Sequence, residues 1–367
     1  MPALPATAPP AQAPLELRDR MRGLLLGTAV GDALGLPAEG VSRPRARKLF
    51  QGRWRHRFLL GRGMLSDDTE HSLFVAQSLL AHPDSPERFT RRLAWCLRLW
   101  FLGLPAGIGL ATLRSILKLW AGVDPRRSGV WSAGNGAAMR AAPIGAFFAG
   151  SREKLDAYLE AATRMTHRDP RALTGVRAVA LLAARAICEP ARPEFSELRC
   201  LLQEAGDDPE WNEILAAMAT ASQDGLSVAD FARSLGLARG VTGYVYHTVP
   251  VAAYAWFRHF RSFEDTLSAV LDCGGDSDST GAIAGALAGA VAGERGIPAD
   301  WIRDILDWPR STTLLRTLAD RLARSAKDGT PGSPVAYFWP GILPRNLLFL
   351  VVVLLHGLRR LAPPYAF

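Results

Sequence analysis

Two short stretches of this sequence carry acidic and hydroxyl side chains at a spacing that suits a hard metal ion. In CGGDSDSTG, two glycines precede Asp276 and Asp278, with Ser277, Ser279 and Thr280 beside them. Carboxylate and hydroxyl oxygens are the ligands that Mg²⁺, Mn²⁺ and Ca²⁺ prefer, and glycine lets the backbone turn sharply enough to gather them. Aspartate and serine are also typical N-caps of helices. For this stretch alone, both interpretations stay open.

The second stretch repeats the pattern near the other end of the chain. Ser66, Asp67, Asp68 and Thr69 come immediately before a helix that we expect to begin near Glu70. Adjacent acids are favourable at a helix N-terminus, so capping alone could explain them. Taken together, however, the two stretches supply enough carboxylates for a dinuclear metal site.

Three further features could serve chemistry but are individually weak. The turn Gly134–Gly136 (GNG) offers backbone N–H groups to an anion, although such turns are more often structural. His167 lies beside Asp169 before a predicted helix, where capping is the commoner role. Asp32 and Glu39, taken singly, are most simply solvated or paired carboxylates.

Periodic glycines indicate which elements position these groups. One set follows the stretch at Asp276 and Asp278, and the other lies in the first predicted helix, each with a spacing of four residues: Gly281, Gly285, Gly289 and Gly27, Gly31, Gly35. Residues four apart share one face of a helix. A glycine inside a helix costs about 1 kcal/mol relative to alanine, so we expect this face to be closely approached by neighbouring backbone. The pattern predicts a central helix clasped by other helices.

The remaining chain reads as helices separated by Pro/Gly breaks, with no alternating strand pattern. The first helix starts at Glu16 and stops near Pro37. Further helices are expected over residues 87–102, 110–120, 170–187, 194–204, 209–221, 227–235, 240–258, 262–272, 279–292, 298–307 and 311–326. Residues 43–57 read as a basic loop. We therefore predict an all-α fold.

Composition narrows the class of protein. The 367 residues are 49% hydrophobic, enough for a large core, and the formal charge of +8 is carried almost wholly by arginine. An arginine-rich surface suits a phosphate-bearing ligand, whereas no basic block supports a nucleic-acid groove. The four cysteines are far apart and indicate neither zinc nor disulfides. A cytoplasmic monomer is the expectation.

Three segments are expected along the chain. Residues 1–14 are a Pro/Ala-rich disordered tail, 15–327 form the domain, and 328–367 comprise a linker and an apolar helix. The apolar run 347–361 is too short to span a bilayer. We expect that helix to be buried on the domain, with a surface membrane anchor as the alternative.

Five of these motifs, in series, resemble the ADP-ribosylglycohydrolase family. They are GDALGLPAEG (31–40), SDDTEHS (66–72), AGNGAAMRAAPIG (133–145), MTHRDP (165–170) and GGDSDSTGAIAGALAG (274–289), and the resemblance covers about residues 20–325. It implies a single compact orthogonal bundle of helices around a dinuclear site that holds two Mg²⁺ or Mn²⁺ ions.

The resemblance also implies roles for individual residues. Glu39 matches the family's essential glutamate, and the catalytic group comprises Glu39, Asp67 and Asp278. The implied metal ligands are Ser66, Asp67, Asp68, Asp276, Asp278 and Ser279. The implied substrate-binding residues are Ser132, Gly134, Asn135, Gly136 and His167.

The sequence departs from the family pattern at three places. Ser66 and Ser279 stand where threonine is usual, which keeps the hydroxyl ligand. Ala133 replaces an aromatic residue that stacks on adenine in some members, and Trp131 or Tyr244 could take its place. The chain after residue 328 lies outside the family core.

The expected activity is hydrolysis of ADP-ribose from a modified protein, at the N-glycosidic bond to arginine. Helix N-terminal amides and arginines would hold the diphosphate. Serine-linked or nucleic-acid-linked ADP-ribose is the alternative substrate. Three other classes also remain: a dinuclear hydrolase of phosphoesters or nucleosides, an inactive ADP-ribose-binding or structural relative, and an immunity protein that also blocks a toxin physically.

Overall fold

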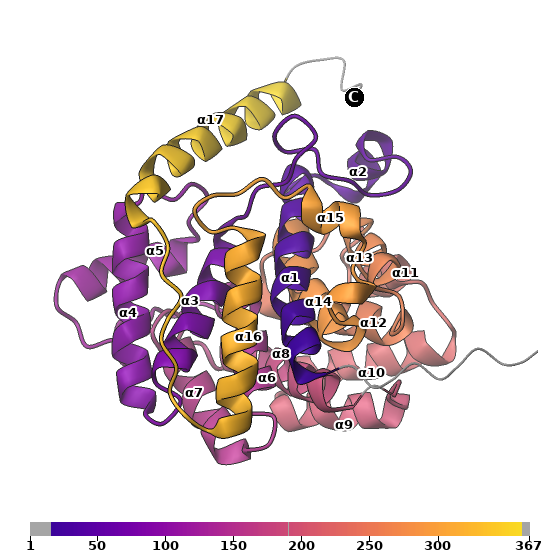
Figure 1. Ribbon diagram of the computed structural model, residues 1–367. Helices are drawn as coiled ribbons and strands as arrows, with labels where there is room; N and C mark the ends of the chain where they lie inside the picture. The colour runs from indigo at the N-terminus through magenta and orange to yellow at the C-terminus, as the bar shows by residue number, and fades with distance from the viewer. Residues whose placement is uncertain (1–15, 190, 362–367) are drawn as a thin grey trace, which may run out of the picture.

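The structure is a computed structural model that describes residues 16–189 and 191–361, so the tail expected over 1–14 lies outside the described residues. Within the described ranges every regular element is a helix (Figure 1), and strand-like pairing is limited to isolated β-bridges. The predicted all-α class is confirmed.

Two antiparallel helices form the centre of the molecule: α1 (Leu17–Gly35) and α14 (Ser277–Ala292). Their glycines face one another, because a Cβ atom built on Gly27 would lie 2.1 Å from the carbonyl oxygen of Gly285, and one on Gly31 would lie 2.0 Å from that of Gly281. No larger side chain fits at these positions. The clasped central helix predicted from the glycine spacing is confirmed.

A shell of helices covers this pair, as Figure 1 shows. Those that pack directly on α1 or α14 are α3 (Asp67–Ala81), α6 (Ala142–Phe147), α8 (Pro170–Cys188), α12 (Val245–Arg258), α13 (Phe263–Leu271), α15 (Ala299–Arg303) and α16 (Thr312–Asp328). Farther out lie α2 (Arg43–Leu49), α4 (Pro86–Leu102), α5 (Leu110–Trp120), α7 (Arg152–Arg164), α9 (Phe195–Ala205), α10 (Pro209–Gln223), α11 (Val228–Ser234) and α17 (Ile342–Leu361).

Most helix starts follow the capping chemistry in the sequence. Ser85, Asp169, Asp208 and Ser262 each accept a backbone N–H from the first turn of the helix they precede. Four expectations were wrong in detail: α2 occupies part of the expected basic loop, α3 begins at Asp67, α12 begins only at Val245, and α15 ends at Arg303. The late start of α12 has a physical cause, since Val241 and Tyr244 form β-bridges with Gly275 and Gly134.

The segment after α16 returns along the domain. The side chain of Gln77, on α3, exchanges hydrogen bonds with the backbone of Val335, at 2.7 and 2.8 Å. Helix α17 then begins at Ile342, earlier than expected, and crosses the edge of the bundle (Figure 1). The expectation of a helix buried on the domain holds for one face only, because Phe349 and Val352 are buried while Leu354 and Leu358 are exposed.

Candidate active site

The two acidic stretches meet at one cavity. It has a volume of about 550 Å³, lies at the N-terminal ends of α3 and α14, and is lined by Asp67, Asp68, Asp276, Asp278 and Ser279 among others. The Ser279 hydroxyl donates to Oδ2 of Asp68 at 3.2 Å, although the two residues are 211 positions apart. The fold therefore brings together the side chains that the sequence places in two separate motifs.

Ser66 stands slightly behind this cavity. It is the N-cap of α3, and its hydroxyl lies 3.3 Å from Oδ2 of Asp68. It does not belong to the described residues that line the cavity. The other five expected ligands do.

The paired glycines before Asp276 are required by a close approach of backbone. Gly274 and Gly275 both have positive φ, +68° and +86°, and a Cβ on Gly275 would lie 1.9 Å from the carbonyl oxygen of Val241. Gly275 also donates to the carbonyl oxygen of Val41 at 2.8 Å. The loop that carries Glu39 is thereby joined to the acidic stretch, and Glu39 lines the same cavity.

Asp32 proves to be part of this arrangement, which sequence reasoning missed. It is fully buried on α1, and its Oδ2 accepts the backbone N–H groups of Ser66 and Thr69 at 2.9 and 3.2 Å. Burial raises the pKa of this carboxyl to about 6. The sequence contained a sign of this burial, because Asp32 lies beside the glycine face of α1. A carboxylate next to a face that packs against backbone has no route to solvent.

The glycine-rich turn lines the opposite side of the cavity with Ser132 and His167. Its backbone is less open to an anion than expected: the N–H of Gly134 is 3.2 Å from Oγ of Ser132, and the N–H of Asn135 donates to the carbonyl oxygen of Gly243 at 2.9 Å. The Asn135 side chain donates to Oδ2 of Asp276 at 2.6 Å. This places Asn135 against the acid cluster.

His167 is a neutral donor in this site. Burial, with Arg140 as a second cause, lowers its pKa to about 3. Arg140 donates to Oγ1 of Thr166 at 2.6 Å, and Thr166 Oγ1 lies 2.9 Å from Nδ1 of His167. If the Thr166 hydroxyl donates to Nδ1, the neutral ring carries its proton on Nε2, the nitrogen that lies toward Gly134 and Gly136.

The cavity is strongly acidic. Among the described residues that line it, five are Asp or Glu and none is Lys or Arg. The pKa values of Asp67, Asp68 and Asp278 are raised well above the ordinary value, first by burial and then by neighbouring carboxylates. The arginines expected at the diphosphate lie elsewhere: Arg126, Arg127, Arg164 and Arg168 line a neighbouring cavity that shares His167.

This donor set fits divalent cations. Oδ1 of Asp68 is buried without a hydrogen-bond partner, and hard oxygen atoms surround it. In the described ranges no three His, Cys, Asp or Glu side chains form a ready-made metal site. Hydroxyl groups such as that of Ser279, and water, would have to complete the coordination.

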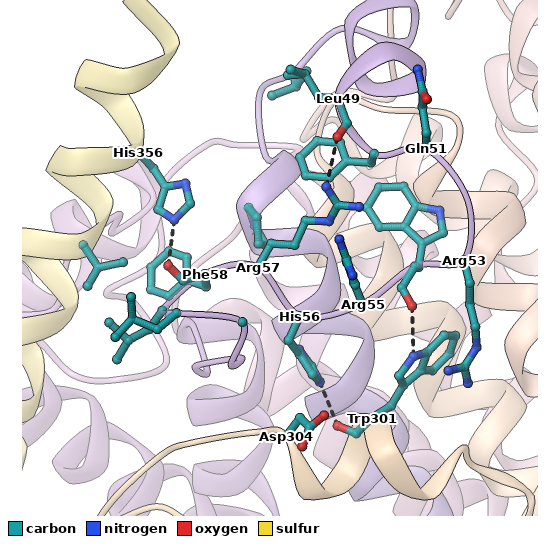
Figure 2. Close-up of a pocket in the computed structure, with 18 of the residues that line it drawn as sticks. Leu49, Gln51, Arg53, Arg55, His56, Arg57, Phe58, Trp301, Asp304 and His356 are labelled. Carbon is teal, nitrogen blue, oxygen red and sulfur yellow. Dashed lines mark hydrogen bonds between the residues drawn. The ribbon is translucent and has the colours of Figure 1, made fainter. Parts of the chain in front are cut away.

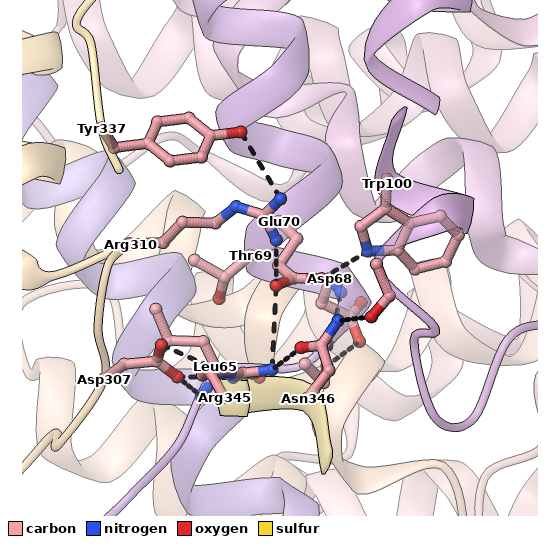
Figure 3. Close-up of polar contacts among 12 residues, drawn as sticks. Leu65, Asp68, Thr69, Glu70, Trp100, Asp307, Arg310, Tyr337, Arg345 and Asn346 are labelled. Carbon is pink, nitrogen blue, oxygen red and sulfur yellow. Dashed lines mark hydrogen bonds and ion pairs between the residues drawn. The ribbon is translucent and has the colours of Figure 1, made fainter. Parts of the chain in front are cut away.

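Behind the acidic face, a buried ionic network holds α3 in place (Figure 3). The Glu70 carboxylate accepts from the Arg310 guanidinium and from the Trp100 indole, and Arg345 of α17 approaches it to 3.8 Å. Arg345 also pairs with Asp307 at 2.5 Å. Glu70 lies two residues after Asp68, so this network fixes the helix turn that presents the carboxylates.

Trp131 and Tyr244 were the two residues that could replace the aromatic ring that stacks on adenine, and both lie outside the cavity. Trp131 is 74% exposed, and the Tyr244 hydroxyl donates to Glu210 at 2.8 Å. Neither is among the described lining residues.

The comparisons of this chain with known proteins agree on one family. The family model described as ADP-ribosylglycohydrolase matches residues 13–331. An uncharacterized protein of Archaeoglobus fulgidus is 34% identical over 79% of this chain and 93% of its own length. The ADP-ribosyl-[dinitrogen reductase] glycohydrolase of Rhodospirillum rubrum is 29% identical over 78% of this chain and 90% of its own.

One more relative and one solved structure are also similar to this chain. The ADP-ribosylarginine hydrolase Tri1 of Pseudomonas putida is 29% identical over 84% of this chain and 80% of its own length. A solved structure named ADP-ribosylglycohydrolase-related protein complex superposes with a TM-score of 0.65, at 28% identity, covering 85% of this chain and 99% of that one.

Proposed function

This chain belongs to the ADP-ribosylglycohydrolase family and is a glycosidic-bond hydrolase, and we propose that its substrate is ADP-ribose joined to an arginine side chain. One observation carries the choice of acceptor. The cavity presents Glu39, Asp67, Asp68, Asp276 and Asp278 without a lining Lys or Arg in the described chain. Four of these acids are the proposed metal ligands, whose charge the two cations would offset, so Glu39 is the carboxylate left to attract a cationic guanidinium, whereas a serine hydroxyl gains nothing from it.

The residues divide into two groups around the bond that breaks. Asp67, Asp68, Asp276, Asp278 and Ser279 would hold the two divalent cations, with Ser66 supporting Asp68. When bound, such ions orient ribose hydroxyls and lower the pKa of water. Ser132, Gly136 and His167 would contact the ADP-ribose, His167 as a neutral donor through Nε2.

Glu39 is suited to move the proton. It is exposed at the cavity mouth, on the loop after α1, where solvent can reach it. As a water oxygen bonds to C1″ of the ribose, Glu39 accepts a water proton, and the carbon–nitrogen bond breaks with its electron pair passing to the guanidine. The guanidine then takes up the proton.

The test compares substrates that differ only in linkage. Peptides carrying ADP-ribose on arginine or on serine are incubated with the enzyme and Mg²⁺ or Mn²⁺, and released ADP-ribose is measured. Asp278→Asn tests the site, with the exposed Asp224→Asn as matched control. We expect release from arginine that Asp278→Asn abolishes and Asp224→Asn leaves intact. Release from serine alone would overturn the proposed linkage.

A further inference from the structure

Helix α17 (Ile342–Leu361) has two faces of different character. Its inner face is buried and includes Arg345, Asn346, Phe349 and Val352. Its outer face exposes large apolar side chains that are between 47% and 65% accessible: Leu347, Leu348, Val351, Leu354, Leu355 and Leu358. Soluble proteins rarely leave a contiguous apolar stripe of this length to water without a partner.

The inner face is fixed to the domain by polar bonds. Arg345 forms the buried ion pair with Asp307, the Asn346 amide donates to the carbonyl oxygen of Gly103 at 2.7 Å, and Nε2 of His356 lies 2.7 Å from that of Phe58. Residues 339–359 form the one described stretch long and apolar enough to cross a membrane, so the expectation of a run too short to span a bilayer was wrong, because the helix begins before the apolar run. Crossing would strip these buried groups of their partners, so the helix stays along the protein surface.

An arginine-lined cavity opens beside α17 (Figure 2). Its volume is about 1210 Å³, and α17 contributes Leu355 and Arg359 to its lining together with Val352 and His356 of the inner face. The facing wall contains Arg45, Arg55 and Arg57, of which Arg55 is exposed. The apolar stripe and the basic cavity thus share an edge.

The acids of this cavity do not neutralise it. Asp300 pairs with Arg53, and Asp304 pairs with Arg62, each at 2.6 Å between nitrogen and oxygen. Arg55 adds to the positive charge that remains. A phosphate-bearing group is the ligand that such a lining favours.

Exposed aromatic side chains flank the start of α17. Trp308, Phe338 and Trp339 are 55%, 60% and 37% accessible, and the rings of Trp308 and Phe338 lie 5.8 Å apart. Tryptophan is typical of the boundary between lipid headgroups and acyl chains.

We propose that this side of the molecule binds the surface of an anionic lipid bilayer. Helix α17 lies in the plane of the interface with its outer face among the acyl chains, and the arginine-lined cavity takes a lipid phosphate. The apolar face excludes a nucleic acid. A second copy of this chain is disfavoured as the partner, because a two-fold contact through α17 would bring two positively charged cavities together. The proposal is independent of the acceptor that the enzyme cleaves.

The test is sedimentation of the full-length protein with vesicles of phosphatidylcholine alone or mixed with phosphatidylglycerol. The outer-face variant carries Leu347→Ser, Val351→Ser, Leu354→Ser and Leu358→Ser together. The matched control is Leu17→Ser, an exposed leucine at the first position of α1. We expect binding to the anionic vesicles, lost in the outer-face variant and kept in the control, with hydrolase activity unchanged in both.

A second pair of variants tests the basic cavity. Arg55→Glu should lower the vesicle partition coefficient by about ten-fold or more, because each basic residue near an anionic surface contributes on the order of 1 kcal/mol. Arg199→Glu, exposed on the distant α9, is the control and should have little effect. Equal binding to both vesicle types would overturn the role of the arginines. If the wild type does not bind vesicles, the whole proposal is overturned. The same holds if the wild type associates with itself instead and the outer-face variant abolishes that association.

Discussion

The side-chain amide of Asn135 donates to the Asp276 carboxylate at 2.6 Å, joining the glycine-rich turn to the acidic stretch across 141 residues of sequence. The same amide donates to Oγ1 of Thr248 at 3.0 Å, which fixes its orientation. Asn135 therefore positions a proposed metal ligand, a role that its motif did not indicate.

Replacing this donor by an acceptor should weaken metal binding. Asn135→Asp places a second carboxylate against Asp276, and loss of such a supporting contact typically lowers metal affinity about 10- to 100-fold. Titration of Mn²⁺ followed by calorimetry measures the effect. Asn212→Asp on the exposed face of α10 is the control, and equal affinities in the two variants would remove Asn135 from the metal site.

Glu39→Gln should separate catalysis from binding. If Glu39 accepts the water proton, the turnover number falls by about 10²- to 10⁴-fold, while the dissociation constant for ADP-ribose stays unchanged. Glu153→Gln, an exposed site on α7, supplies the comparison. A Glu39 variant that turns over normally would assign the proton transfer to another group.

Divalent metal should stabilise the fold as well as support activity. The carboxylates are gathered at one cavity only in the folded protein, so a cation that binds there at 100 times its dissociation constant should add about 2.7 kcal/mol to the free energy of unfolding. Thermal unfolding with Mg²⁺, Mn²⁺ or a chelator measures this. Asp278→Asn should show a smaller increase, and full activity in chelator would contradict the metal dependence.

The glycine contact between α1 and α14 predicts a large steric effect. A Cβ at Gly27 would lie 2.1 Å from the carbonyl oxygen of Gly285, so Gly27→Ala must push the central helices apart and should cost about 3 kcal/mol or more. Gly357→Ala is the matched control, because a Cβ at Gly357 on α17 meets open space. Denaturant unfolding compares the two variants, and equal stability would show that α1 and α14 can separate freely.

Buried histidines should make the protein acid-sensitive. Burial lowers the pKa of His71 well below its ordinary value, so the unfolded chain binds the proton first. The stability is complete above pH 6.5 and falls as the pH decreases below it, by about 2 kcal/mol per histidine between pH 7 and 5. In His71→Gln that loss should be smaller by this amount when urea unfolding is compared at the two pH values. An unchanged loss would show that His71 is protonated in the folded protein.

The sequence predicted those parts of the fold that rest on local patterns. Glycine spacing predicted a central helix clasped by its neighbours, and Pro/Gly breaks separated most of the helices along the chain. The family resemblance predicted that Glu39, Asp67, Asp278 and the glycine-rich turn share one site, and all of them line the cavity. What local patterns could not provide was the partner of each polar group.

Those partners come from distant parts of the chain. From the sequence, Asp32 is most simply a solvated or paired acid, and its partners prove to be the backbone N–H groups of Ser66 and Thr69. Glu70 marked only the expected start of a helix, and its partners Arg310 and Arg345 lie about 240 and 275 residues further along the chain. The outer face of α17 was missed for a related reason: an apolar run does not reveal which of its faces has a partner.

The pairing of α1 with α14 also affects how the protein folds. The Ser277 hydroxyl donates to the carbonyl oxygen of Gly35 at 2.8 Å, across 242 residues. During synthesis the glycine face of α1 emerges early and its partner emerges late, so most of the chain is made before the centre can close. Long sequence separation slows folding. We therefore expect slow refolding, whose late step is the docking of the first helix against α14, and a nascent chain that depends on chaperones until α14 is complete.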